Sequence, residues 1–258
     1  MVTWDPDRYL AYADERGRPF ADLLARVSIA DPADVLDLGC GPGNLTRTLV
    51  ERWPQAWVRG LDSSAEMIEQ AQRNVPGVTF EIADLRAWAA GEDQVDLVVS
   101  NAVFQWVPGH LDLLPAIADR VRPGGVLAFQ VPGNEGEPSQ TLRLELAARA
   151  PYAEHLAGVE EISSHDPADY LDVLATRGWT VDAWTTTYLH VLAGDDPVFD
   201  WFSGTGLRPT LQALPDDLRP RFEDELTALL REAFPREDYG TVMPFRRVFV
   251  VAQKQGTS

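Results

Sequence analysis

The sequence predicts an α/β protein whose core is an open, mostly parallel sheet of seven strands with helices on both faces. Short β-rich runs alternate with helical stretches over the first half of the chain, which is the pattern of a parallel sheet with crossover helices. The run 95–100 is apolar nearly throughout, as expected of a strand buried on both faces. The Arg-Pro-Gly-Gly segment at 122–125 is a strong stop signal between a helix and the next strand.

The predicted elements follow one another in a regular order. Strands are expected at 34–38, 57–61, 78–82, 95–100, 126–131, 180–192 and 246–252, and helices at 18–27, 45–53, 65–74, 110–121, 140–149 and 166–177. The last of these helices has the clearest start, because Asp166 suits the N-cap, Pro167 the first helical position and Asp169 the first turn. Gly178 then ends it.

A helical segment precedes the last predicted strand. Residues 194–239 have a helical pattern, and 222–234 is clearly amphipathic. Because a predicted strand of the same sheet lies on either side of it, we expect a helical cap inserted at about 194–240. The chain 1–258 is then a single domain of Rossmann-like α/β type.

Composition narrows the possible partners and the location. The chain has 22 Lys and Arg against 40 Asp and Glu, a formal charge of −18, which disfavours nucleic acid and anionic membranes as partners. Cys40 is the single cysteine, so neither an internal disulfide nor a cysteine-rich metal site is expected, and we predict no metal. The sequence has no signal peptide and no long apolar run, which predicts a cytoplasmic protein.

The segment from Asp37 to Asn44, DLGCGPGN, follows the first predicted strand and opens a helix. Its glycines let the backbone turn tightly and let a ligand lie against it. Asp62 comes at the end of the second predicted strand, where a carboxylate can accept both hydroxyl hydrogens of a ribose. Asp84 lies just past the third. Together these residues predict a nucleoside site along the carboxyl ends of neighbouring strands.

The spacing of the glycines favours S-adenosylmethionine (SAM) over NAD. The NAD pattern G-x-G-x-x-G would end at position 44, which is Asn44 rather than glycine. Asp37 places a negative charge in the loop, which suits the cationic sulfonium and amino groups of SAM and would repel a pyrophosphate. In these residues the chain resembles the class I SAM-dependent methyltransferases.

That resemblance implies a role for each residue of the motif. The glycine loop would hold the methionine part of SAM, the acid after the second strand its ribose, and the acid after the third strand its adenine amino group. By resemblance these roles fall to Asp37, Gly39, Gly41, Asp62 and Asp84. Leu85 and Met67 would be apolar neighbours of the adenine. The remaining predicted cofactor contacts are Cys40, to which we assign no chemical role, Asn44, Ser63 and Asn101.

A closer resemblance covers essentially the whole chain. Five short segments, in this order and spacing, are similar to the trans-aconitate 2-methyltransferase family: Trp4-Asp5-Pro6, Glu15 to Pro19, Asn101 to Trp106, Thr205 to Pro209 and Arg247 to Ala252. The resemblance implies methyl transfer from SAM to a carboxylate of trans-aconitate or a closely related polycarboxylic acid, giving a monomethyl ester and S-adenosylhomocysteine.

Recognition of such an acid calls for arginines, because the guanidinium fork matches a carboxylate with two hydrogen bonds. Arg208, expected in a loop of the cap, is the first candidate, followed by Arg18 and the pair Arg246–Arg247. Trp106 and Tyr188 are predicted to line the acceptor pocket, and His190 to pack within a strand. For each arginine the alternative is a surface ion pair with one of the many acids.

The chemistry predicts no catalytic acid or base, because a carboxylate nucleophile is already ionised near neutral pH. Three alternatives remain open at this point. The first is a SAM-dependent methyltransferase of a quinol, an amine or another carboxylic acid; a phenol or carbon nucleophile would favour a nearby base, and His110 or His190 could serve as one. The others are an NAD-dependent dehydrogenase and a SAM-binding protein without turnover.

Overall fold

The computed structural model describes residues 13–159 and 161–256, so Trp4-Asp5-Pro6 of the resemblance lies outside the described residues. The strands are β1 Asp34–Leu38, β2 Trp57–Asp62, β3 Thr79–Ile82, β4 Val95–Asn101, β5 Val121–Pro132, β6 Trp179–Leu192, β7 Arg236–Glu237 and β8 Gly240–Lys254. The helices are α2 Ala13–Ala25, α3 Thr46–Arg52, α4 Ala65–Asn74, α5 Leu85–Ala89, α6 His110–Asp119, α7 Pro138–Ala147, α8 Ala153–Leu156, α9 Pro167–Ala175, α10 Pro197–Ser203, α11 Arg208–Ala213 and α12 Arg219–Ala233, with a 3₁₀ turn η1 at Phe104–Trp106.

The described strands form one mixed sheet in the order β3-β2-β1-β4-β5-β8-β6, and β7 pairs with β8. Strands β1 to β5 pair in parallel, whereas β8 runs antiparallel to β5. This confirms the predicted α/β class with a mostly parallel sheet. The chain order reverses between β1 and β4, so the crevice at their carboxyl ends is where such sheets bind ligands.

The chain divides into two compact units. The sheet unit comprises residues 14–133, 164–186 and 247–258, and the helical unit includes 134–163 and 187–246. The segment predicted as an insert at about 194–240 lies within the helical unit, which also contains α7 and α8. That this insert caps a single domain stays a prediction.

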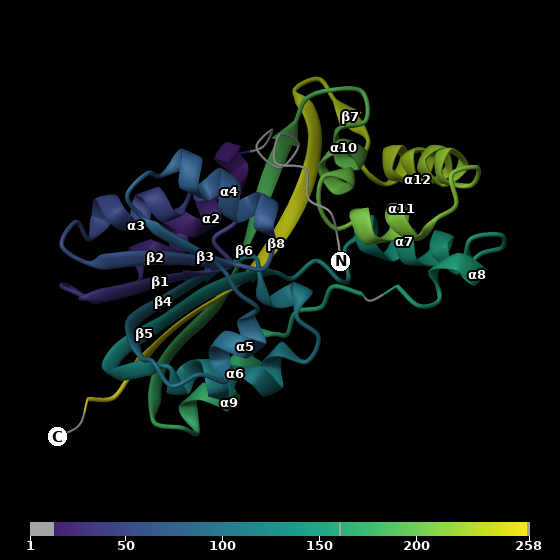
Figure 1. Cartoon of the computed structure of the whole chain (residues 1–258). Coiled ribbons are helices and arrows are strands. Elements are labelled where there is room, and N and C mark those ends of the chain that lie inside the picture. Colours follow the sequence, from purple (N-terminus) through teal and green to yellow (C-terminus); the bar gives the residue numbers. More distant parts are fainter. Residues whose placement is uncertain (1–12, 160, 257–258) are drawn as a thin grey trace. The chain divides into compact units, whose positions relative to one another are not determined.

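Within the sheet unit, α2, α3 and α4 lie on one face of the sheet and α5, α6 and α9 on the other (Figure 1). The apolar run of β4 is buried as predicted, with Leu97, Val98 and Val99 inaccessible to solvent. Val98 forms one continuous cluster with Leu36, Phe129 and Val250 of neighbouring strands. This core fixes the strands whose carboxyl ends carry the glycine loop and the acids.

Several elements differ from the sequence prediction; helix α8, for example, lies where no element was expected. Helix α5 was not expected, because it is only five residues long and has no apolar period of its own. β5 begins at Val121, before the Arg-Pro-Gly-Gly stop signal, and its pairing with β4 shifts register between Val95 and Leu97, which is how a strand accommodates proline. The segment 194–239 contains three helices and β7, since Gly204 follows α10 and Pro215 precedes α12.

The helical unit has its own hydrophobic core. Trp201 of α10, Leu207 before α11 and Phe222 of α12 are buried together with Tyr152, which follows α7. The rings of Tyr152 and Phe222 meet edge to face, with centroids 4.9 Å apart. Among the described residues, no helix combines the length and apolar character needed to cross a membrane.

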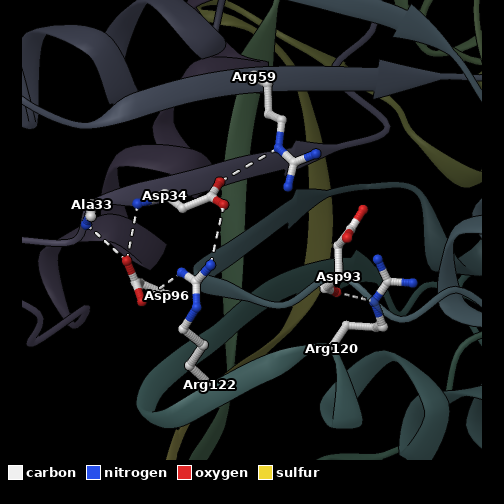
Figure 2. Close-up of polar contacts among 7 residues, drawn as sticks. All are labelled: Ala33, Asp34, Arg59, Asp93, Asp96, Arg120 and Arg122. Atoms are coloured by element: carbon white, nitrogen blue, oxygen red, sulfur yellow. Dashed lines mark hydrogen bonds and ion pairs between the residues drawn. The ribbon is translucent and has the colours of Figure 1, made fainter.

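Charged side chains link four parallel strands, β1, β2, β4 and β5, near their amino ends (Figure 2). Oδ2 of Asp96 accepts hydrogen bonds from the backbone amides of Ala33, at 2.8 Å, and Asp34, at 3.0 Å, while its Oδ1 accepts from Arg122 Nη1 at 2.9 Å. Arg122 also lies 3.7 Å from the Asp34 carboxylate, and Arg59 pairs with that carboxylate from β2 at 3.4 Å. Burial raises the pKa of Asp96, but the Arg122 hydrogen bond and the two amides together hold it below its ordinary value.

We expect Asp96→Asn to lower the free energy of unfolding at pH 7 by about 1–3 kcal/mol, because a charge-assisted bond to Arg122 is lost. Since the folded-state pKa of Asp96 is lowered, this stabilisation is present above the ordinary carboxyl pKa and disappears as the pH falls through the folded-state value. Chemical denaturation at pH 7 and in acid measures both effects. The control is Asp119→Asn, which breaks an exposed pair with Arg177. An equal loss in both variants would contradict the assignment.

Candidate active site

The glycine loop after β1 is fixed to the end of β2. The backbone amides of Gly39 and Cys40 both donate to the Leu61 carbonyl, at 2.7 and 2.9 Å. Gly39 has φ of +80°, and a Cβ there would lie 2.2 Å from Cγ2 of Val103, so a side chain is excluded both by the backbone and by the available space. The backbone at Gly39 thus packs closely against Val103, whereas a Cβ on Gly41 would meet nothing within 4 Å.

Asp37, the first residue of the motif, is a buried carboxylate. Its side chain is at the end of β1, and its Oδ2 accepts a 2.6 Å hydrogen bond from Oγ1 of Thr46, the first residue of α3. Burial raises the pKa of Asp37 to about 7, the Thr46 hydrogen bond opposes that rise, and the charge of Asp62 adds to it. The site therefore contains an acid for which a nearby positive charge would be favourable.

Asp62, the second predicted acid, binds the loop itself. Its Oδ2 accepts from the amide of Gly41 at 2.9 Å, and its Oδ1 accepts from the amide of Ser64 at 2.9 Å. Burial raises the pKa of Asp62, and these backbone hydrogen bonds limit the rise. Each carboxylate oxygen has a further lone pair, so the two bonds leave Asp62 able to accept hydroxyl hydrogens. Ser63, beside it, is exposed.

Asp84, the third predicted acid, is the N-cap of α5. Its Oδ1 accepts from the amides of Arg86, at 2.8 Å, and Ala87, at 3.0 Å, and its side chain is exposed. Leu85 is buried as the first residue of that helix, and Met67 is buried in α4. The structure places these three predicted residues in the sheet unit, as it does the glycine loop.

The other predicted cofactor residues differ in their surroundings. Cys40 is buried, and burial is the main reason that the pKa of its thiol is raised, which agrees with the absence of an assigned chemical role. Asn44 is half-buried in the turn before α3. Asn101, the last residue of β4, accepts a 2.6 Å hydrogen bond from Gln130 Nε2 through its Oδ1. Ala102, which follows it, has φ of +58°, a conformation that costs energy outside glycine and is frequent at functional sites.

One hydrogen-bonded chain connects a predicted cofactor residue to a predicted acceptor residue. Gln130 of β5, whose amide donates to Asn101, also accepts from Nη1 of Arg247 at 3.2 Å. Both Gln130 and Arg247 are buried. Sequence reasoning missed Gln130, since a single glutamine in an apolar strand gives no motif; a polar residue at a position that must be buried was the available signal.

The remaining acceptor candidates are divided between the two units. Trp106, half-buried in η1, and Arg18, exposed on α2, belong to the sheet unit, and Arg208 and Tyr188 belong to the helical unit. Arg208 was expected in a loop, and this is wrong: it is the first residue of α11, because the following proline is compatible with a first helical turn. Tyr188 is buried, with its ring centroid 6.1 Å from that of His190.

His110, considered above as a possible base, is buried in the core of the sheet unit. Its Nε2 lies 2.8 Å from the hydroxyl of Tyr170. Burial, and then the neighbouring His165, lower the pKa of His110 to about 4, so the ring is neutral near pH 7. A buried ring that already shares a hydrogen bond with a tyrosine is poorly placed to take a proton from a substrate.

We expect Asp37→Asn to stabilise the protein at pH 8, on the order of 2–4 kcal/mol, and to have little effect at pH 5. The folded-state pKa of Asp37 is raised, so the wild type loses stability as the pH rises from the ordinary carboxyl value towards about 7, and the neutral amide does not. Chemical denaturation at the two pH values tests this. A gain of the same size at both would show that charge burial is not the cause.

Comparison with known proteins agrees with this geometry. A family model described as a methyltransferase domain matches residues 12–183. A trans-aconitate 2-methyltransferase of Streptomyces avermitilis is 51% identical and aligns with 99% of this chain and 98% of its own length. One of Rhodococcus jostii is 48% identical over 98% of this chain and its own full length, 100%.

Solved structures confirm the fold. A putative methyltransferase of Bacillus halodurans is 14% identical, with a TM-score of 0.60, over 93% of this chain and 100% of that one. A putative sarcosine dimethylglycine methyltransferase of Galdieria sulphuraria has a TM-score of 0.58 at 14% identity, over 99% of this chain and 93% of that one. The glycine loop, its acids and the near full-length relatives lead to one conclusion: the chain belongs to the methyltransferase-domain family and, within it, to the trans-aconitate 2-methyltransferase family.

Proposed function

We propose that the protein transfers a methyl group from SAM to a carboxylate of trans-aconitate or a closely related polycarboxylic acid. The products are a monomethyl ester and S-adenosylhomocysteine. The observation that carries the proposal is a glycine loop tied to the half-buried carboxylate of Asp62, with the buried carboxylate of Asp37 at the end of β1, in a chain whose near full-length relatives bear the name trans-aconitate 2-methyltransferase.

The residues of the loop fit SAM. The open space at Gly41, where a Cβ would meet nothing within 4 Å, suits the methionine part, and the carboxyl group of Asp37 gains a favourable partner in a positively charged amino or sulfonium group. Asp62 retains acceptor capacity for ribose hydroxyls, and Asp84, Leu85 and Met67 are assigned to the adenine. When bound, SAM supplies a methyl group that is activated by its sulfonium charge.

The reaction requires the acceptor oxygen, the methyl carbon and the sulfur to be aligned, and it requires no proton transfer. The carboxylate oxygen of the acceptor forms the new O–C bond as the S–C bond breaks, and no proton has to move because the acid is already ionised. Holding the reacting atoms in line is worth up to roughly 7–11 kcal/mol in favourable models. We therefore assign no catalytic acid or base, and the neutral, buried state of His110 supports this choice.

The family and the composition bear differently on the three alternative functions. Membership of a methyltransferase family argues against an NAD-dependent dehydrogenase. Methylation of a quinol, an amine or another carboxylic acid, and SAM binding without turnover, are decided by assay. A small-molecule substrate agrees with the family, and we propose a cytoplasmic enzyme that binds neither nucleic acid nor membranes, on the basis of its formal charge of −18.

We expect labelled SAM, offered with a panel of di- and tricarboxylic acids, to yield a base-labile methyl ester with trans-aconitate and to yield none with monocarboxylic acids. The reason is that recognition by arginines needs carboxylates besides the one that is methylated. Retained SAM with no ester from any acid would favour a binding protein. Label transferred to a quinol or amine instead would assign the protein to another substrate class.

We expect Arg208→Lys to raise KM for the acid at least about tenfold, about 1.4 kcal/mol, because an ammonium cannot reproduce two parallel hydrogen bonds to a carboxylate. SAM affinity should stay unchanged. Steady-state kinetics with each substrate varied in turn separates the two effects. The matched control is Arg221→Lys, in an exposed pair with Glu225 on α12. If KM for the acid is unchanged in Arg208→Lys, or if SAM affinity falls equally, Arg208 has only a structural role.

A further inference from the structure

A second arginine of the helical unit lies in surroundings that suit a carboxylate of the substrate. Arg143 is on α7, and its side chain is 4% exposed. Two buried neutral groups hold its guanidinium: Gln140 Oε1 accepts from Nε at 3.1 Å, and Thr210 Oγ1 accepts from Nη1 at 3.2 Å. We call Arg143, Gln140 and Thr210, together with Glu161, the Arg143 site.

The charged partner of Arg143 is of a different kind. Both carboxylate oxygens of Glu161 accept from the guanidinium fork, Oε1 from Nη1 at 3.3 Å and Oε2 from Nη2. The Glu161 side chain is nevertheless 46% exposed, and it belongs to the stretch 161–166, which is neither helix nor strand. A buried guanidinium is therefore paired with a carboxylate that can leave with little loss of regular structure.

The Arg143 site adjoins the segment that contains Arg208. Thr210 lies two residues beyond Arg208 in α11, and a Cβ on Gly206 would lie 3.4 Å from Ile162 and 3.6 Å from the side-chain amide of Gln140. Residues 205–210 thus pack directly against this site. The sequence pointed to the same segment through Arg208, and the structure adds an arginine from another helix beside it.

We propose that Arg143 receives one carboxylate of the acceptor acid, and that Glu161 is the internal carboxylate that this acid replaces. The inference rests on the proposed function. Among the described residues Glu161 is the charged group paired with Arg143. Removing such a partner from a buried guanidinium would be strongly unfavourable, whereas exchange of one carboxylate for another keeps the pairing. The two bonds accepted by Glu161 are the bidentate contact that a substrate carboxylate would make. Gln140 and Thr210 keep the fork oriented throughout the exchange.

Two variants give opposite effects if Glu161 competes with the acid. We expect Arg143→Lys to raise KM for trans-aconitate at least about tenfold, with the Kd of SAM unchanged. Glu161→Gln should lower that KM by about threefold or more, because a neutral amide competes less well for the guanidinium. If the ion pair between Arg143 and Glu161 had only a structural role, Glu161→Gln would not lower the KM for trans-aconitate.

Thermal unfolding adds a measurement that does not depend on turnover. Trans-aconitate should raise the Tm of the wild type, raise that of Glu161→Gln by more, and leave that of Arg143→Lys nearly unchanged. If Arg143→Lys does not fold, the enlarged shift in Glu161→Gln still decides the question. The matched control pair is Arg231→Lys and Asp196→Asn, since Arg231 also binds both oxygens of its partner but is 62% exposed.

The outcomes separate this inference from the proposed function. Wild type that makes no ester with any polycarboxylic acid overturns the function and the inference with it. Wild type that makes the ester, with an unchanged KM and an unchanged Tm shift in Glu161→Gln, overturns the role of Arg143 alone. Equal changes in KM and in the Tm shift for Arg231→Lys and Asp196→Asn would also overturn it, because the effects would then not be specific to Arg143.

Discussion

The candidate cofactor site depends on one carboxylate, that of Asp62, which joins the glycine loop to the end of a strand of the sheet. Asp62 stands at the end of β2 and binds the amides of Gly41 and Ser64, one with each oxygen. The loop contains three glycines, Gly39, Gly41 and Gly43, with positive φ, a conformation that other residues avoid. The buried sheet fixes the position of Asp62, and Asp62 fixes that of the loop. This connection holds the loop at the carboxyl edge of the sheet.

The two ends of the parallel strands use charge in opposite ways. At the amino ends, Asp96 and Asp34 are neutralised by Arg122 and Arg59, which stabilises the fold. At the carboxyl ends, Asp37 is buried and Asp62 half-buried, and removal from solvent raises the pKa of both. Charge that is costly to the folded protein is therefore concentrated where a cationic ligand would relieve it, as is common at functional sites.

An acidic protein that binds an acidic substrate must supply positive charge locally. Several described arginines, such as Arg177 and Arg231, pair with acids at the surface, where a pair contributes little. Arg143 is buried and oriented by neutral groups, and Arg247 is buried beside Gln130. An arginine suited to recognise a carboxylate therefore differs from the surface arginines in being buried and held in one orientation. A sequence motif around the arginine does not show either property.

The sequence alone indicated which candidate site residues follow the first three strands: the glycine loop, then Asp62, then Asp84. Local spacing and strand periodicity can be recognised in a sequence without knowledge of tertiary contacts. It also indicated the family, through short segments spread along the chain. It did not indicate the short helix α5 that Asp84 caps, the helical start at Arg208, or the partners of Gln130 and Arg143. Those depend on which side chains meet after folding: Thr210 and Glu161 reach Arg143 from segments far along the chain, and no local pattern in the sequence encodes such a meeting.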